Sequence, residues 1–140
     1  MLPVTHLDTS FLIRALVPGS PEDATLRAWL RRGLPVAASA VVWTELLCGP
    51  LTAREAELAL LVVGEPVPFC GEHAALAASL FNATGRRRGS LADCMVAAAA
   101  IRSEAELATA NEADFARFVP LGLRLAPAES ARPARPRPRK

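Results

Sequence analysis

Short apolar runs alternate along the chain with longer segments in which apolar residues recur at helical spacing. Short runs bounded by turn signals are typical of buried strands, and they predict strands at residues 3–7, 34–38, 106–109 and 121–125. Because helical segments separate these runs, we expect crossover connections between parallel strands. The pattern therefore predicts an α/β fold in which helices cover both faces of a central, mainly parallel sheet.

Several of the predicted helices carry clear start signals. In Ser20-Pro21-Glu22-Asp23, a capping serine precedes a proline at the first helical position, and an acid follows three residues after the cap. Thr52 and Glu55 form a similar capping box, and Ser39 is a favoured cap for the helix before it. We predict helices at residues 9–16, 21–32, 39–49, 52–63, 72–87 and 90–102, a short helix after Asn111, and an extended segment at residues 66–69.

Length and charge divide the chain into two parts. The 140 residues, 51% of them apolar, suit one domain, which we place at residues 1–126. The segment 127–140 is rich in proline and arginine, and we expect it to be disordered. Its last ten residues carry five positive charges, whereas the first 130 residues carry a net charge of −3. This tail either aids solubility or adds electrostatic affinity for a polyanion.

Composition also excludes several classes of protein. No apolar run is long enough to span a bilayer, and no signal peptide is recognisable, so we expect a cytoplasmic protein without a membrane partner. Cys48, Cys70 and Cys94 are widely spaced and odd in number, which argues against a disulfide framework or a structural zinc site, and we expect them mostly buried and reduced. Only His6 and His73 are available for a histidine-dependent site.

Asp8 and Asp114 lie at junctions between a strand and a helix. Asp8 directly follows the first predicted strand, and Asp114 follows the third, just after Thr109 and Asn111. Each acid has a structural alternative: Asp8 as a helix N-cap, and Asp114 as helix-start chemistry three residues after Asn111. The carboxyl end of a parallel strand is, however, where open α/β sheets bind their ligands.

Glu45 and Asp93 lie on predicted helices with apolar surroundings. Glu45 has Val41, Val42 and Cys48 as its helical neighbours, so its carboxylate lies either at an exposed edge or in a cleft held by a cation. Asp93 heads a helix of small apolar residues, which is typical of a buried helix. A capping box with Ser90 is the structural alternative for Asp93.

Together these four acids predict a metal site. Junctions of this kind gather at one edge of a parallel sheet, where four carboxylates repel one another unless cations neutralise them. Oxygen ligands favour Mg²⁺ or Mn²⁺, and Mg²⁺ commonly uses one or two carboxylates together with water and substrate phosphate. We therefore expect a Mg²⁺ site, with Mn²⁺ as a substitute, that acts on phosphate esters.

The same motifs, in the same order, resemble those of the PIN-domain ribonucleases, and most closely the VapC-type toxins of toxin–antitoxin pairs. They are the segment 7–13, the helix of Glu45, Ala92-Asp93, and the segment 109–115, so the resemblance spans about residues 2–125. It implies a three-layer α/β/α fold, Mg²⁺-dependent endoribonuclease activity, a homodimer, and inhibition by a small cognate antitoxin. The implied metal-binding and catalytic residues are Asp8, Glu45, Asp93 and Asp114, with Thr9, Ser10, Thr109 and Asn111 as polar supports. The basic tail is not part of the family pattern.

Other residues have two interpretations each. Arg86, Arg87 and Arg88 precede Asp93 by five to seven residues and are either a solvated helix end or a clamp for RNA phosphates. Trp29 and Trp43 stand at helical spacing among apolar residues, which favours the core over base stacking. His6 is expected to be packed, and the apolar helix at 52–63 suggests a surface for a second subunit or an antitoxin.

Alternative functions differ in what they require of the acids. A PIN-like nuclease for RNA maturation would use the same residues outside a toxin–antitoxin pair, and a DNA flap nuclease would need inserted loops that this short chain lacks. A haloacid-dehalogenase phosphatase needs a second aspartate two residues after the first, where this chain has Ser10. A module that only binds RNA or an antitoxin has no need of all four acids.

Overall fold

The structure is a computed structural model that describes residues 3–127, and four parallel strands form its centre. The strands are β1 (Thr5–Leu7), β2 (Val36–Ala37), β3 (Glu106–Ala108) and β4 (Arg124–Leu125), in the spatial order β2-β1-β3-β4. The register pairs Thr5 with Val36 and Glu106, and Leu107 with Leu125. All pairs are parallel, so all four strands present their carboxyl ends at one edge of the sheet.

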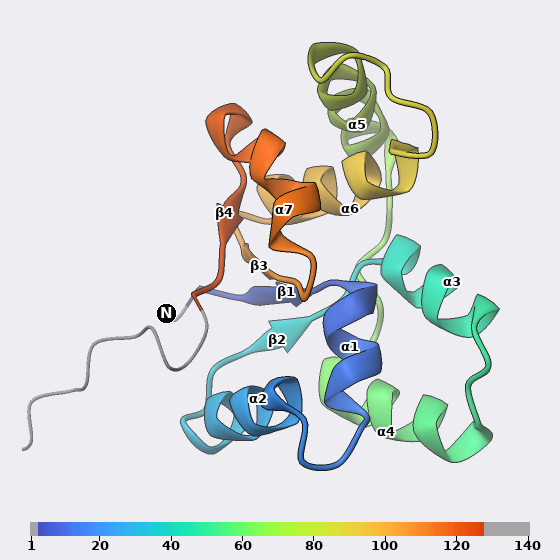
Figure 1. The fold of residues 1–140 in the computed structure, drawn as a ribbon, viewed down its shortest axis with the longest axis vertical. Helices are drawn as coiled ribbons and strands as arrows, with labels where there is room; N and C mark the ends of the chain where they lie inside the picture. Colours follow the sequence, from blue (N-terminus) through green and yellow to red (C-terminus); the bar gives the residue numbers. More distant parts are fainter. Residues whose placement is uncertain (1–2, 128–140) are drawn as a thin grey trace, which may run out of the picture.

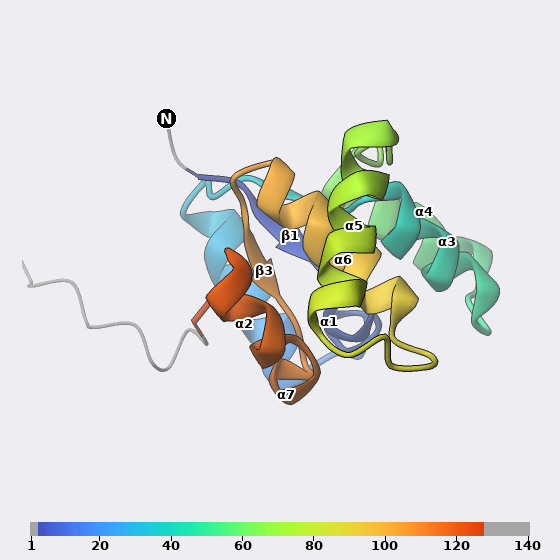
Figure 2. The same cartoon turned by 90° about the horizontal axis from the view of Figure 1, so that it is seen from above.

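Helices cover both faces of this sheet, which confirms the three-layer α/β/α prediction. In Figure 1 the strands run between α1, α2 and α4 on one side and α5, α6 and α7 on the other. Seen from above in Figure 2, α5 lies outside α6, which packs against β3. The helices are α1 (Thr9–Ala15), α2 (Pro21–Arg31), α3 (Ala40–Cys48), α4 (Ala53–Val63), α5 (Gly71–Ala83), α6 (Leu91–Arg102) and α7 (Glu112–Phe115), followed by the 3₁₀ helix η1 (Ala116–Leu121).

The predicted start signals operate as expected. The Ser20 hydroxyl accepts the amide of Asp23, and Ser39 accepts the amide of Val42. Thr52 and Glu55 form both hydrogen bonds of a capping box. These local bonds satisfy amides that the first turn of a helix leaves unpaired, which is why the starts of the helices follow from the sequence.

One helix end and one strand start differ from the prediction. The helix predicted to reach residue 87 ends at Ala83, because the Thr84 hydroxyl bonds back to the Leu80 carbonyl oxygen and Gly85 turns the backbone with φ of 87°. This earlier end leaves Arg86–Arg88 in a loop instead of on a helix. The predicted last strand is shortened to β4, because η1 occupies residues up to Leu121.

The core lies on both faces of the sheet and around α6. Trp29 and Phe11 stack with ring centroids 5.6 Å apart, so the expectation that Trp29 belongs to the core is confirmed. The alanines at 97–100 in α6 are fully buried, which lets α5 and β3 approach this helix closely. Within residues 3–127, no helix combines the length and the apolar character that a membrane span needs. The proposed tail lies, apart from Pro127, outside the described residues.

Candidate active site

Asp8 follows β1 and is held by side chains from two strand ends. Its backbone amide extends the ladder to the carbonyl oxygen of Ala108, at 2.9 Å. The residue occupies the N-cap position of α1, but its side chain makes no capping bond. Instead, Oδ2 accepts hydrogen bonds from the hydroxyls of Ser10 at 2.9 Å and Thr109 at 2.8 Å. The capping alternative is therefore wrong for this buried carboxylate, which is 5% exposed.

The supporting hydroxyls are themselves fixed by the backbone of the segment after β3. Ser10 Oγ accepts the amide of Ala110 at 3.1 Å, and Thr109 Oγ1 accepts the amide of Asn111 at 3.0 Å. Asn111 thus contributes through its backbone. Because each hydroxyl accepts an amide, its own proton remains directed to Asp8, whose carboxylate is held in one orientation.

Glu45 reaches the same region from α3. The side chain is exposed, and its Oε1 accepts a hydrogen bond of 3.0 Å from the hydroxyl of Thr9. Thr9 is the first residue of α1 and follows Asp8 directly. This bond therefore ties the α3 acid to the helix that begins at the first acid, and Thr9 acts as the predicted polar support.

Asp93 lies in the first turn of α6. Ser90 makes no side-chain cap, and its hydroxyl donates to the carbonyl oxygen of Arg87 at 2.7 Å, so the capping-box alternative is wrong. Burial and the negative charge of Asp8 raise the pKa of Asp93, and Asp114 and Glu45 add to the shift. Arg117 opposes it, and the resulting pKa is about 6. The other three acids thus all influence the Asp93 carboxyl group.

Asp114 stands in α7 and is exposed. Its backbone amide donates to the carbonyl oxygen of Asn111 at 3.0 Å, while the amide of Asn111 is used by Thr109. The Asn111 side chain makes no capping hydrogen bond. The capping interaction that the helix-start alternative expects between Asn111 and Asp114 is therefore absent. The electrostatic effect of Asp114 on Asp93 places its carboxylate at the same edge of the sheet.

Arg117 is a member of this cluster that sequence reasoning missed. Its Nη2 lies 3.7 Å from Oδ2 of Asp93, and its guanidinium lies over the ring of Phe118, 4.6 Å from the centroid. Arg117 is 19% exposed, and its Nε and Nη2 have no hydrogen-bond partner among the described residues. The sequence feature that could have indicated its role is its position about one helical turn after Asp114. The site therefore combines four acids with one fixed cation.

The side chains of this site suit a hard divalent cation that also binds water. The atoms that could coordinate a metal are carboxylate and hydroxyl oxygens, which Mg²⁺ and Mn²⁺ prefer. Among residues 3–127, no three Asp, Glu, His or Cys side chains lie close enough together to hold one ion directly. The residues therefore fit an ion bound by one or two carboxylates with water filling the other positions, the usual arrangement for Mg²⁺.

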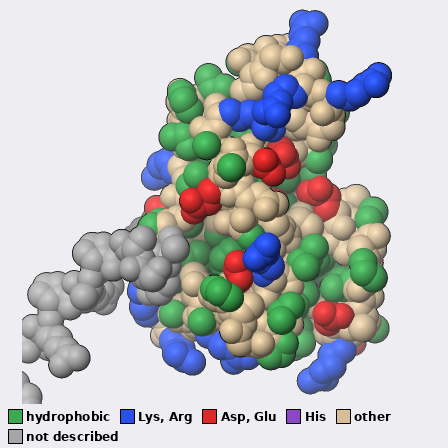
Figure 3. All heavy atoms as spheres, viewed as in Figure 1, with side chains coloured by type: hydrophobic (Ala, Val, Ile, Leu, Met, Phe, Trp, Pro, Cys, Tyr) green, Lys and Arg blue, Asp and Glu red, His purple; other side chains and the backbone are tan. Residues whose placement is uncertain are grey.

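The arginine cluster lies in the loop between α5 and α6. Arg86, Arg87 and Arg88 are exposed, and the bond from Ser90 to the Arg87 carbonyl oxygen ties this loop to the start of the Asp93 helix. Figure 3 shows basic side chains at the end of the molecule that holds α5, and acidic side chains farther down the same face. The three arginines lie just beyond the C-cap Thr84 of α5 instead of in its last turn, and they are solvated as the first interpretation expected.

Several residues outside this cluster complete the comparison with the sequence. Trp43 is partly buried against the core, and His6 is 3% exposed, as expected. Burial and, to a smaller extent, the nearby His73 lower the pKa of His6 to about 4. The expectation that the cysteines are mostly buried is wrong, because only Cys94 is buried and both Cys48 and Cys70 are exposed.

Solved structures with the same fold include toxin–antitoxin complexes. VapBC2 from Rickettsia felis, bound to a DNA fragment from their promoter, matches with a TM-score of 0.71, 20% identity, and coverage of 88% of this chain and 97% of that chain. FitAcB from Neisseria gonorrhoeae matches with a TM-score of 0.65, 21% identity, and coverage of 89% and 97%. DNA-bound VapBC from Salmonella typhimurium matches with a TM-score of 0.64, 24% identity, and coverage of 90% and 98%.

Sequence comparison gives the family. No curated protein matches this chain. The family model described as the PIN domain matches residues 6–119, which contain all four acids and Arg117. The chain belongs to the PIN domain family.

Proposed function

We propose that the protein is a Mg²⁺-dependent endoribonuclease and the toxin of a toxin–antitoxin pair. The observation that carries this proposal is the clustering of Asp8, Glu45 and Asp114 close enough to Asp93 to act on its charge, in a chain of the PIN family. Carboxylates that disfavour one another's charge gain stability when a divalent cation joins them. The solved complexes with the same fold, named VapBC and FitAcB, support the second half of the proposal.

In this mechanism the acidic residues hold one or two cations, and the hydroxyls hold the acids. Asp8, Asp93 and Asp114 bind Mg²⁺ or Mn²⁺ directly or through water. When bound, such an ion lowers the pKa of a coordinated water and offsets charge on the scissile phosphate. Glu45, held by Thr9 Oγ1 at 3.0 Å, completes the cage or orients the attacking water. Ser10 and Thr109 keep the Asp8 carboxylate in place.

The substrate requires positive charge, because the carboxylates repel a phosphate backbone. Arg86, Arg87 and Arg88 supply it from the loop that leads into α6. Backbone contacts of this kind position a nucleic acid without reading its sequence. The arginine loop therefore binds RNA phosphates beside the acids.

The partner surface for a small antitoxin is an apolar pocket between α1, α2 and α4. It has a volume of about 290 Å³ and is lined chiefly by Leu12, Leu16, Leu26, Leu30, Leu58 and Val62. Leu58 and Leu30 remain 42% and 43% exposed. Exposed apolar surface with charged neighbours, here Asp23 and Arg27, is typical of a protein-binding site. The homodimer implied by the family resemblance is part of the same proposal.

Induced expression followed by mapping of RNA ends tests this function. Three chains are compared: the unaltered protein, Asp8→Asn, and Glu72→Gln as a control that removes an exposed carboxylate from α5. We expect growth arrest and discrete cuts with the unaltered and control chains, and neither with Asp8→Asn. Purified protein should lose cleavage in EDTA and regain it with Mg²⁺ or Mn²⁺. Equal cutting by Asp8→Asn would refute the assignment, and cutting without growth arrest would favour an RNA-processing nuclease.

A further inference from the structure

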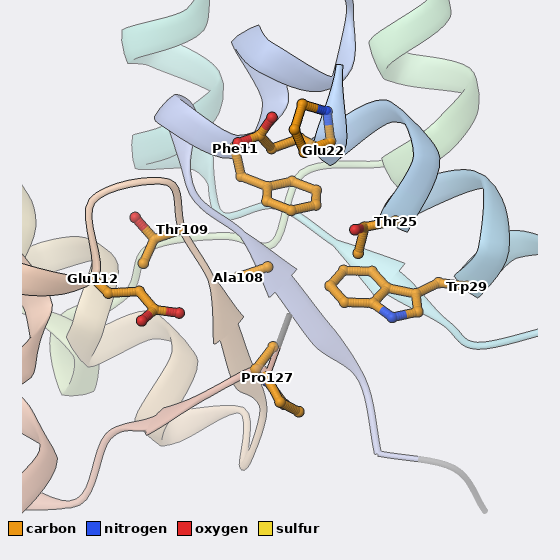
Figure 4. A pocket seen from close by; sticks show the side chains of 10 residues that line it. Phe11, Glu22, Thr25, Trp29, Ala108, Thr109, Glu112 and Pro127 are labelled. Carbon is orange, nitrogen blue, oxygen red and sulfur yellow. The ribbon is translucent and has the colours of Figure 1, made fainter. Parts of the chain in front are cut away.

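A second pocket opens beside the acidic cluster, on the side of β3 that faces α2. It has a volume of about 120 Å³ and lies between the start of α1, the first turns of α2 and the segment after β3. Figure 4 shows Phe11, Thr25 and Trp29 on one side of it, Thr109 and Glu112 on the other, and Pro127 at its lip. No residue of this pocket belongs to the proposed set of metal-binding acids.

The walls of the pocket combine aromatic surface with hydrogen-bond acceptors. Phe11 and Trp29 stack nearly parallel, at an interplanar angle of 9°, and close one side. The carboxylate of Glu112 points toward Ala108, into the space between the two sides (Figure 4). Glu22 lines the same pocket, and its Oε2 is buried without a hydrogen-bond partner among the described residues.

The two charged groups that line the pocket, Glu22 and Glu112, are both hydrogen-bond acceptors. The nearest cation to Glu22 is Arg14, whose Nη1 lies 3.9 Å from Oε1, too far for a hydrogen bond. The Thr109 hydroxyl proton is already directed to Asp8 Oδ2, at 2.8 Å. A ligand that carries N–H groups on a flat apolar body therefore suits these carboxylates.

Thr109 joins this pocket to the acidic cluster. Its side chain lines the pocket, and its hydroxyl holds the Asp8 carboxylate. Phe11 makes a second connection, because it lies on the first turn of α1, three residues after Asp8. The pocket and the acidic cluster are therefore neighbours that share these two residues.

We propose that this pocket binds one nucleobase of the RNA next to the cleaved bond and that it selects cytosine. The proposal rests on the ribonuclease function proposed above. A closed cavity of about 150 Å³ holds a benzene ring, so an open pocket of about 120 Å³ has room for a single ring and excludes the two rings of a purine. Carboxylates accept hydrogen bonds from the N4 amino group of cytosine. Uracil presents a carbonyl oxygen at the same position, which a carboxylate repels.

The test uses the full-length protein and three oligoribonucleotides that are identical except at one base. That base is cytosine, uracil, or 2-pyrimidinone, which has the cytosine ring without the amino group. Cleavage rates are measured with Mg²⁺, and binding is measured by fluorescence anisotropy without Mg²⁺. We expect cytosine to be favoured about tenfold over both other bases, the typical effect of one good base contact.

Glu112→Gln identifies the residue responsible, with Glu72→Gln as the matched control. The glutamine amide both donates and accepts, so Glu112→Gln should bring uracil close to cytosine, while the control keeps the preference. Cleavage with no base preference, or with a preference that Glu112→Gln leaves intact, would overturn the pocket assignment. Binding that prefers cytosine through Glu112 without cleavage would instead refute the nuclease and support the pocket.

Discussion

The Asp8 carboxylate owes its orientation to two hydroxyls that are separated from each other by almost the whole chain. Ser10 lies two residues from Asp8, whereas Thr109 lies 101 residues away and bonds the same oxygen. The sequence predicted both residues as polar supports, but the hydrogen-bond pattern depends on the pairing of β1 with β3. Each hydroxyl accepts a backbone amide, which leaves its proton for the acid.

Replacing Thr109 with valine should weaken metal binding. The change keeps the shape of the side chain and removes the donor to Asp8 Oδ2, and loss of an outer partner commonly lowers metal affinity by about 10-fold or more. It also removes the acceptor of the exposed Asn111 amide, which water can replace, so the free energy of unfolding should fall by only about 1 kcal/mol. Calorimetric titration with Mn²⁺ measures the first effect and urea unfolding the second. Thr44→Val, at an exposed threonine on α3, is the control and should change neither property. Unaltered Mn²⁺ affinity in Thr109→Val would contradict the supporting role of Thr109.

Asp93 should make the metal-free protein less stable at neutral pH than at mildly acidic pH. Its pKa of about 6 in the folded protein exceeds the ordinary value of 3.8, so the folded state disfavours the charged form. The cost is fully present above pH 6 and disappears as the pH falls toward 4. The side chain is 36% exposed, and solvent screening reduces the effect to about 1 kcal/mol.

Asp93→Asn tests this sign directly. In EDTA at pH 8 the variant should be more stable than the unaltered protein by about 1 kcal/mol, because the cost of burying the charge and the repulsion from Asp8, Asp114 and Glu45 are removed and together exceed the lost attraction of Arg117. The gain should shrink between pH 6 and pH 4. Urea unfolding at several pH values measures it, with Glu72→Gln as the control. A variant less stable than the unaltered chain at pH 8 would contradict the electrostatic picture.

At the scale of the elements, α6 connects the core to the site. It presents fully buried alanines to its neighbours and carries Asp93 in its first turn. Small side chains let α5 and β3 approach closely, so the position of the Asp93 carboxylate depends on this packing.

Ala97→Leu should therefore destabilise the protein. Ala97 is 0% exposed, and extra methylene groups in a filled core commonly cost about 1–3 kcal/mol. Ala78→Leu, at an exposed alanine on α5, adds the same atoms to the surface and should have little effect. Thermal or urea unfolding compares the two variants. Equal stability of the two variants would mean that the packing around α6 has space for the larger side chain.

The elements also show which features sequence patterns determine. Each strand lies within the run predicted for it, and the helix starts at caps such as Thr52 with Glu55 were predicted correctly, because buried apolar runs and caps act locally. The end of α5 was not predicted correctly. The hydrogen bond from the Thr84 hydroxyl to the Leu80 carbonyl oxygen and the turn at Gly85 end the helix, although the predicted helix continues to residue 87. Arg117 was missed because its partner Asp93 is 24 residues away, and the sequence carried no pattern that links the two.

At the scale of the whole molecule, the charge is distributed unevenly. The acids gather at the carboxyl edge of a parallel sheet. The first 130 residues carry a net charge of −3, so the RNA binding proposed above requires local positive regions. The loop at Arg86–Arg88 is such a region, and Arg117 adds a cation within the acidic cluster.

Neutralising the arginine loop should reduce both RNA affinity and its dependence on salt. Each phosphate contact contributes about 0.7 to the slope of log affinity against log salt for a single strand, so replacing Arg86, Arg87 and Arg88 with glutamine should lower the slope by up to about 2. The matched control replaces three exposed arginines on other elements, Arg31, Arg54 and Arg102, and makes the same change in net charge. Fluorescence anisotropy titrations of a labelled RNA from about 50 to about 200 mM salt measure this slope for each triple variant. If both triple variants change the slope equally, RNA responds to net charge alone and the loop has no special role.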